Sequence, residues 1–256
     1  MQLRDYQIDL IEKGLKVIKS KGILYLAMEV RTGKTLTSLG ICQKLKRKNV
    51  LFITKKKAIS SITHDYNMMM ADFNIEIINY ESLHKQTLRS IDMIICDEAH
   101  SMGAFPKPSK RAKMVKLLLT KYRCPMILLS GTPTPESFSQ IYHQFYGHHL
   151  NPFSVYRNFY QWSSDYVNVT QKMISGNYIK DYSSGIEVKI KFAIQPYLLT
   201  YTQKAAGFQT VIEEEVLEVE MKPFTYRLCK RLKKDLIIEG KECVILADTG
   251  VKLMQK

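Results

Sequence analysis

Short apolar runs alternate with amphipathic stretches along the first 145 residues of the chain. Residues 7–19 have apolar side chains at helical spacing, which predicts a helix with one buried face, and Gly22 marks its end. The apolar run 23–30 predicts a buried strand, and the segment that begins at Lys34 again has helical spacing. The chain therefore opens with a helix, a strand, a loop and a second helix.

The strand and helix pattern then recurs. Further apolar runs predict strands over residues 49–54, 75–80, 91–96 and 125–130. Helices are expected through Met70, briefly after residue 80, over residues 109–121 and over residues 136–146. This alternation predicts an α/β fold with a mainly parallel sheet flanked by helices on both faces. Right-handed crossovers place the loops after the strands at one edge of such a sheet.

The loop after the first predicted strand partly matches a phosphate-binding loop. The pattern G-x-x-x-x-G-K-[ST] ends here in Gly33, Lys34 and Thr35, but Met28 occupies the position of its first glycine. Such a loop binds phosphate through backbone N–H groups at a helix N-terminus and through the lysine charge. A G-K-T triplet alone is explained equally well by an ordinary helix start, so a second observation must decide.

That observation is the sequence DEAH at residues 97–100, directly after the strand predicted over residues 91–96. A carboxylate at a strand end can hold Mg2+, and the next carboxylate can orient or deprotonate an attacking water. A helix-capping Asp followed by Glu is the structural alternative. Because both loops are expected at the same sheet edge, coincidence explains the pair poorly, and we interpret the Gly33 loop as a nucleotide site.

Composition narrows the setting. The chain has 256 residues and a formal net charge of +14, which favours an anionic partner such as nucleic acid or an anionic membrane surface. Its five cysteines are scattered without a C-x-x-C pair, so neither a disulfide framework nor a zinc site is indicated. No apolar run approaches the ~20 residues that span a bilayer, and the N-terminus lacks a signal-peptide core. We expect a soluble cytoplasmic protein.

The motifs together resemble a family. They are Leu3-Arg4-Asp5-Tyr6-Gln7, Gly33-Lys34-Thr35, Asp97-Glu98-Ala99-His100 and Ser130-Gly131-Thr132-Pro133. Their order is similar to that of superfamily 2 helicases and translocases, and within them to the compact Swi/Snf-like DNA translocases of phages and bacteria. That family's phosphate loop often lacks the first glycine, which accommodates Met28, but it more often has glycine where this chain has Arg31. The role of Arg31 is therefore open.

The resemblance implies a RecA-like P-loop lobe that binds ATP and Mg2+. Gln7 matches the glutamine that reads the adenine edge, and Lys34 the lysine that contacts the β and γ phosphates. Thr35 and Asp97 would hold Mg2+, and Glu98 would activate water, with Lys34, Asp97 and Glu98 as the catalytic set. The expected ATP-binding residues are Arg4, Gln7, Met28, Glu29, Val30, Arg31, Thr32, Gly33, Lys34 and Thr35.

Two further groups follow from the same resemblance. His100, Ser130 and Thr132 match residues that couple the nucleotide to the DNA-facing surface, although an ordinary turn also explains the last two. Thr54, Lys55, Lys56 and Lys57 follow the second predicted strand, where the family contacts the DNA backbone without reading bases. Any single lysine is also explained as part of a solvated face.

The remainder of the chain divides into two parts. Residues 146–200 predict a helical protrusion with a hairpin, and we favour a core role over base stacking for its aromatic residues, which include Trp162. His143, His148 and His149 lack a metal-binding set. Residues 201–256 resemble the return to the first lobe, with a strand over residues 211–221 and an amphipathic helix through about Glu239.

No Q-x-x-G-R-x-x-R element follows Thr132, so we expect this chain to be the first lobe, residues 1–145 with these appendages, of a two-lobe motor. The first hypothesis is an ATP-dependent DNA helicase or translocase, acting on duplex DNA with a second RecA-like lobe and weakly active alone. The alternative is a nucleotide-gated DNA-binding module without motor activity. A small-molecule P-loop kinase fits poorly because it leaves Gln7 and the S-G-T-P motif unexplained.

Overall fold

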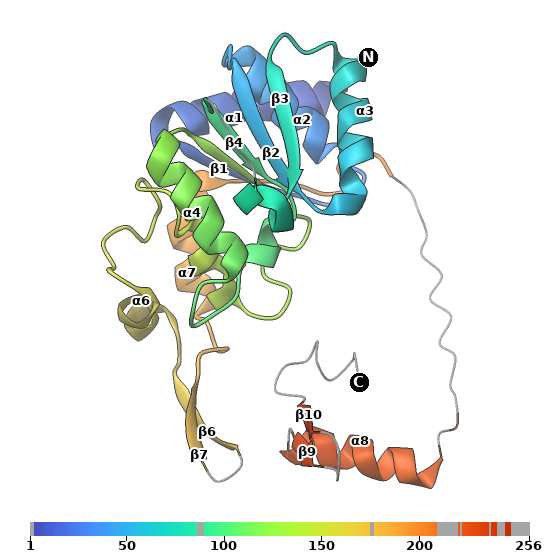
Figure 1. The fold of residues 1–256 in the computed structure, drawn as a ribbon, viewed down its shortest axis with the longest axis vertical. Coiled ribbons are helices and arrows are strands. Elements are labelled where there is room, and N and C mark those ends of the chain that lie inside the picture. Colours follow the sequence, from blue (N-terminus) through green and yellow to red (C-terminus); the bar gives the residue numbers. More distant parts are fainter. Residues whose placement is uncertain are drawn as a thin grey trace.

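A six-stranded parallel sheet forms the centre of the protein (Figure 1), with the strand order β3-β2-β4-β5-β1-β8. In the computed structural model, residues 3–85, 90–174, 177–208, 220, 222–235, 237–239 and 244–246 are described. The strands are β1 (Ile23–Met28), β2 (Asn49–Thr54), β3 (Asn74–Asn79), β4 (Met93–Cys96), β5 (Met126–Leu129) and β8 (Leu198–Tyr201). Every neighbouring pair is parallel, as the alternating pattern predicts.

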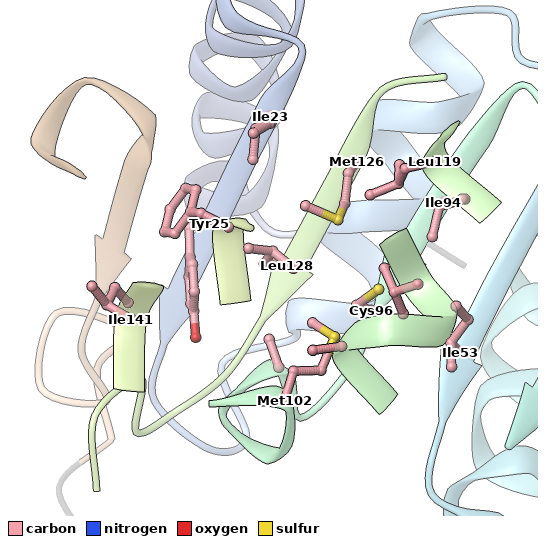
Figure 2. Packing of buried hydrophobic residues seen from close by; sticks show 14 of the residues in the cluster. Ile23, Tyr25, Ile53, Ile94, Cys96, Met102, Leu119, Met126, Leu128 and Ile141 are labelled. Atoms are coloured by element: carbon pink, nitrogen blue, oxygen red, sulfur yellow. The ribbon is translucent and has the colours of Figure 1, made fainter. Parts of the chain in front are cut away.

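Helices cover both faces of this sheet. The first face packs against α1 (Asp5–Lys21), α2 (Lys34–Lys44) and α3 (Ile59–Met69). The second packs against α4 (Lys110–Tyr122), α5 (Ile141–Phe145) and α7 (Glu187–Ile194), and α6 (Phe159–Tyr166) packs on α5 as part of the same core. Each face of the sheet has its own hydrophobic core, and alternate residues of β1 point into the two cores. Leu24 and Leu26 lie in the first core, and Ile23 and Tyr25 lie in the second. Figure 2 shows part of the second core, where Tyr25 and Leu128 extend from neighbouring strands.

The strand ends establish where the chemistry lies. β1, β2, β4 and β5 are neighbours in one parallel sheet, so the loops that follow them meet at a single edge. The pairing continues past β4, because the Asp97 backbone N–H donates to the Ile53 carbonyl at 2.8 Å. The short 3-10 helices η1 (Lys56–Ala58), η2 (Tyr80–Lys85) and η3 (Ala99–Met102) follow at this edge. The predicted α/β fold with motif loops at one sheet edge is confirmed.

The protrusion contains both predicted features and one helix that the sequence pattern missed. β6 (Thr170–Ile174) and β7 (Asn177–Asp181) form an antiparallel hairpin, and Trp162 on α6 is fully buried. The missed helix is α7, whose sequence EVKIKFAI alternates polar and apolar residues, as strands do. Ile190 and Ile194, one helical turn apart, are both buried in the second core. Tertiary packing of that face outweighs the strand preference of β-branched residues.

The remaining elements are η4 (Phe138–Gln140), η5 (Gln195–Tyr197), α8 (Pro223–Asp235), β9 (Ile237–Glu239) and β10 (Val244–Leu246). The predicted C-terminal amphipathic helix corresponds to α8, which ends before Glu239, and the strand expected over residues 211–221 lies outside the described residues. In the part of the chain that is described, no helix is long and apolar enough to cross a membrane.

Candidate nucleotide-binding site

The loop between β1 and α2 is shaped by Gly33. Gly33 has φ 80°, in the left-handed region, and a Cβ atom there would lie 2.2 Å from Nε2 of Gln7. Only glycine meets both conditions without displacing its neighbours. The buried Thr32 donates its hydroxyl to the Glu29 carbonyl at 2.6 Å, which closes the loop on itself. Arg31 also has a positive φ, 63°, where the related loops more often have glycine.

Lys34 begins α2 and bends back over this loop. Its Nζ donates to the carbonyl oxygens of Met28 at 2.9 Å and Glu29 at 3.0 Å. Burial lowers the pKa of Lys34, and the negative charges of Asp97 and Glu98 oppose that change. The Lys34 side chain lines the same cleft as Glu98, and among the described residues its hydrogen-bond partners are these neutral carbonyls. An anion with several oxygens can displace those carbonyls and pair with the charge.

Gln7 supports the loop from α1. It is 3% exposed; its Oε1 accepts the Arg4 backbone N–H at 2.9 Å, and its Nε2 donates to the Gly33 carbonyl at 3.5 Å. Tyr6 adds a hydrogen bond from its hydroxyl to the Thr32 carbonyl at 3.1 Å. Both polar ends of Gln7 thus engage backbone groups of the protein. Recognition of adenine by Gln7 stays a prediction.

Asp97 lies at the end of β4, and its environment favours a bound cation. The Thr54 hydroxyl donates to Asp97 Oδ2 at 2.7 Å, and the Tyr80 hydroxyl donates to the Asp97 carbonyl at 2.7 Å. Burial raises the pKa of Asp97, and the neighbouring Glu98 raises it further, while the Thr54 hydrogen bond and Lys34 lower it. A nearby cation would relieve this crowding of negative charge.

Glu98, His100 and Ser130 form a connected chain beside Asp97. Glu98 adopts a left-handed conformation, φ 50°, and its Oε2 lies 3.3 Å from His100 Nδ1. His100 Nδ1 also lies 3.0 Å from the Ser130 hydroxyl oxygen, which accepts the Thr132 backbone N–H at 3.1 Å. Burial lowers the pKa of His100. The structure thus brings together the three residues expected to couple the site to the rest of the protein.

These groups surround a cleft of about 530 Å³. Its lining comprises Glu29, Val30, Lys34, Lys55, Glu98, His100, Gly131, Thr132 and Gln203. All four predicted motif loops, after β1, β2, β4 and β5, contribute to it. Polar groups of both charges converge there, as expected of a site for a phosphate ester.

The sequence motifs did not indicate that Gln203 belongs to this cleft. Its backbone N–H donates to Glu29 Oε2 at 2.6 Å, and its Nε2 donates to the Val30 carbonyl at 2.9 Å. Two residues earlier, Tyr201 accepts the Glu29 backbone N–H through its carbonyl at 2.9 Å and stacks on Tyr6 with ring centroids 4.5 Å apart. Residues 201–203 follow the edge strand β8, so only the pairing of β8 with β1 reveals their place.

The four residues expected to contact DNA separate into two kinds. Lys55, Lys56 and Lys57 are exposed, and Lys55 Nζ lies 3.8 Å from Glu98 Oε1. Thr54 is fully buried, and its hydroxyl is engaged by Asp97. The side chain of Thr54, the last residue of β2, therefore faces the carboxylate site, and a contact of Thr54 with the DNA backbone stays a prediction.

The proposed Mg2+ donors fit a hard cation. Thr35 lies in the first turn of α2, next to Lys34, and the oxygen of its hydroxyl and the carboxylate of Asp97 are ligands of the type that Mg2+ prefers. Mg2+ is commonly bound through one or two protein oxygens, water and substrate phosphates. No group of three or more His, Cys, Asp or Glu side chains suited to a metal occurs among the described residues.

Comparisons with known proteins agree with this geometry. The sequence model of the SNF2-related domain matches residues 47–236, and that of the type III restriction enzyme res subunit matches residues 1–71. A search of curated proteins found no match.

Among solved structures, the Sulfolobus solfataricus SWI2/SNF2 ATPase core in complex with dsDNA is similar, with a TM-score of 0.58 and 16% identity. The match covers 81% of this chain and 46% of that chain. The Pyrococcus furiosus Hef helicase domain matches with a TM-score of 0.44 and 15% identity over 57% of this chain and 36% of that chain. Because the SNF2-related domain model spans most of the sequence and the fold is that of a RecA-like lobe, the chain belongs to this family of superfamily 2 helicase ATPases.

Proposed function

We propose that the chain is the ATP-hydrolysing lobe of a DNA translocase or helicase that moves on duplex DNA. The observation that carries the proposal is the convergence of Lys34, Glu98 and His100 on one cleft at the carboxyl ends of the parallel strands, with Asp97 directly before Glu98 at the end of β4. In open α/β sheets, ligands bind in the crevice at this edge. The family relationship supports nucleotide hydrolysis as the chemistry.

Each side chain has a role that its surroundings support. Lys34 exchanges its two loop carbonyls for the β and γ phosphates, and the backbone N–H groups that begin α2 point toward the same anion. Glu98 orients and deprotonates the attacking water. Mg2+, held by Thr35 and Asp97, would neutralise charge on the phosphates when bound.

Coupling to DNA follows from the chain of contacts beyond Glu98. His100 links Glu98 to Ser130, so a change in the charge at the γ phosphate alters a hydrogen-bonded path between β4 and β5. Lys55 contacts Glu98 from the end of β2, next to the exposed Lys56 and Lys57. These lysines would bind DNA phosphates without reading sequence. The net charge of +14 gives the field that favours this association.

We further propose that turnover needs a second RecA-like lobe. The chain matches less than half of the length of the Sulfolobus solfataricus ATPase core, whose title names a complex with dsDNA. Arginines offered to the γ phosphate from outside a P-loop lobe accelerate hydrolysis by roughly a thousandfold or more. The isolated residues 1–256 should therefore bind ATP and hydrolyse it slowly.

The test is steady-state ATP hydrolysis by residues 1–256 with and without duplex DNA over a salt series, beside equilibrium ATP binding. Lys34→Ala should abolish binding, and Glu98→Gln should retain binding but abolish the residual turnover. Failure of the parent chain to bind ATP would refute the nucleotide site. DNA-stimulated turnover that both substitutions abolish would instead refute the requirement for a second lobe. Nucleotide-dependent DNA binding that never leads to turnover, even with a second lobe supplied, would favour the gated DNA-binding module.

A further inference from the structure

Lys55 and Glu98 lie opposite each other where two neighbouring strands end at the cleft. β2 and β4 pair in parallel with Ile53 opposite Cys96, and the Asp97 backbone N–H continues this ladder by donating to the Ile53 carbonyl at 2.8 Å. Beyond this pair, Lys55 and Glu98 both line the cleft, and Lys55 Nζ lies 3.8 Å from Glu98 Oε1. The register of the two strands therefore holds this lysine beside the carboxylate to which we assign the attacking water.

The protein engages both oxygens of the Glu98 carboxylate. Lys55 lies on the side of Oε1, and His100 Nδ1 lies 3.3 Å from Oε2. A general base must have an oxygen within hydrogen-bond reach of the proton that it accepts. While Lys55 pairs with Oε1, the ammonium group competes with water for that oxygen. Departure of Lys55 frees Oε1 for the attacking water, and the contact with His100 remains.

The contact between Lys55 and Glu98 is readily exchanged for another. The two side chains are 51% and 39% exposed, respectively. An ion pair with this much solvent contact favours its bound arrangement by a factor of only about 1.4 to 5, because water competes for both charges. A second anion that reaches Lys55 can therefore replace Glu98 as its partner.

Lys55 is also the first residue of the exposed lysine segment 55–57. Lys56 and Lys57 follow it in η1, and all three side chains are exposed. Of the three, Lys55 alone lines the cleft. A DNA phosphate bound along this segment attracts the Lys55 ammonium group away from the cleft, since both partners are anions and the ammonium group carries one charge. One side chain thus connects the DNA-facing lysines with the general base.

We propose that Lys55 is a positioning residue for Glu98 and that DNA acts on the reaction by taking Lys55 from it. Without DNA, Lys55 restrains the carboxylate; with a DNA phosphate on Lys55, Oε1 is free to accept the proton of the attacking water. This inference rests on the proposed function, because it takes Glu98 as the general base and the lysine segment as a DNA contact. It adds the exchange of one lysine between the two.

A double-mutant cycle in DNA binding tests this exchange without requiring ATP turnover. The dissociation constant of a short duplex is measured at fixed salt and without nucleotide for the full chain, Glu98→Gln, Lys55→Ala and the double variant. Glu98→Gln releases Lys55 for the phosphate, so it should tighten DNA binding about threefold more in the parent than in Lys55→Ala.

Lys56→Ala provides the matched control cycle, because it removes a neighbouring DNA-facing charge that has no ion pair with Glu98 among the described residues. Lys56→Ala should itself weaken DNA binding, but Glu98→Gln should tighten binding in this background as much as in the parent. The comparison separates release of Lys55 from the general effect of removing one negative charge near DNA.

Single-turnover ATP hydrolysis gives a second readout. Lys55→Ala should raise the DNA-free rate constant about threefold, leave the half-saturating ATP concentration unchanged and reduce the further acceleration by DNA. Lys55→Arg keeps the charge and should behave as the parent does. A lower rate constant for Lys55→Ala would identify Lys55 as a ligand of the ATP phosphates and overturn the proposal.

The binding cycles distinguish the remaining outcomes. Equal tightening by Glu98→Gln with and without Lys55 overturns the proposal, and so does a coupling that occurs in ATP binding and not in DNA binding. A chain that binds ATP and DNA without this coupling refutes the present inference alone, whereas a chain that binds neither refutes the proposed function as well. Thermal melting of each variant separates lost binding from lost folding.

Discussion

Thr54→Val separates two roles for the last residue of β2. The fully buried Thr54 hydroxyl donates to Asp97 Oδ2 at 2.7 Å, and valine has nearly the same shape without that donor. The loss leaves the Asp97 carboxylate with one hydrogen bond fewer and removes an influence that lowers its pKa. Asp97 must be ionised to hold Mg2+, so the acid limb of the activity profile should move to higher pH.

The magnitude follows from the type of bond. A hydrogen bond to an ionised group contributes about 1.5–3 kcal/mol. Asp97 keeps some solvent contact, so we expect the lower end, about 1.5 kcal/mol, which is roughly a tenfold loss in kcat/KM for Mg-ATP. The DNA dissociation constant and its dependence on salt should not change, because the hydroxyl faces the carboxylate.

The assay measures ATP hydrolysis against pH and Mg2+, and DNA binding against salt, in the most active form of the protein. Thr54→Ser keeps the hydroxyl and should restore both kcat/KM and the pH profile. Lys56→Ala serves as the opposite control, because it should weaken DNA binding and leave the pH profile unchanged. An unaltered acid limb in Thr54→Val, combined with weaker DNA binding, would refute the assignment of Thr54 to Asp97.

Three further changes test other contacts. Gly33→Ala should destabilise the fold by about 1–2 kcal/mol in chemical denaturation and abolish ATP binding, because φ is 80° and the new Cβ would collide with Gln7. Gly131→Ala is the control and should change the stability little, because the atom nearest to its new Cβ lies at 3.6 Å. Gln203→Ala removes one partly exposed hydrogen bond to the phosphate loop and should weaken ATP binding roughly two- to tenfold in equilibrium titration, whereas unchanged affinity would deny it a positioning role. Asp97→Asn should raise the melting temperature at neutral pH, because burial raises the pKa of Asp97 and its ionised form therefore opposes folding. In a pH series this gain should vanish below about 4, the pKa of an aspartate in the unfolded chain, where Asp97 is neutral in both states.

Local pattern was sufficient to predict strands β1 to β5 and the order of the motif loops, but not the edge strand β8. The strands β1 to β5 are short buried runs between amphipathic stretches, and parallel connection then fixes which ends carry chemistry. The same reasoning placed Lys34 and Asp97 at one edge of the sheet, and in the structure both follow the carboxyl ends of parallel strands, β1 and β4. It failed for α7, because burial of Ile190 and Ile194 decides that segment and depends on a surface formed by distant residues.

Thr54 and Gln203 show the same limit at the site. From the sequence, a threonine at a strand end beside three lysines could contact DNA or act as a buried hydrogen-bond donor. The buried role depends on Asp97, which is 43 residues away in sequence on the neighbouring strand β4. Gln203 is separated from Val30 by 173 residues, and no motif surrounds it. Contacts across such distances depend on strand order, which periodicity does not determine.

The position of Gln203 has a consequence for how the lobe works. Residues 201–208 continue directly from β8, and Gln203 among them forms hydrogen bonds with Glu29 and Val30 of the phosphate loop. The ring centroid of Phe208 lies 5.6 Å from Cζ of Arg4. The loop that receives the phosphates is therefore held from outside its own motif, by the segment that leads toward the C-terminal elements. A force that displaces this segment would remove the contacts that hold Glu29 in place and leave the phosphate loop less ordered, so the loop would bind phosphates less well. Nucleotide affinity and the position of the C-terminal segment are thus linked through one glutamate, and by reciprocity ATP binding should stabilise the contacts of residues 201–208.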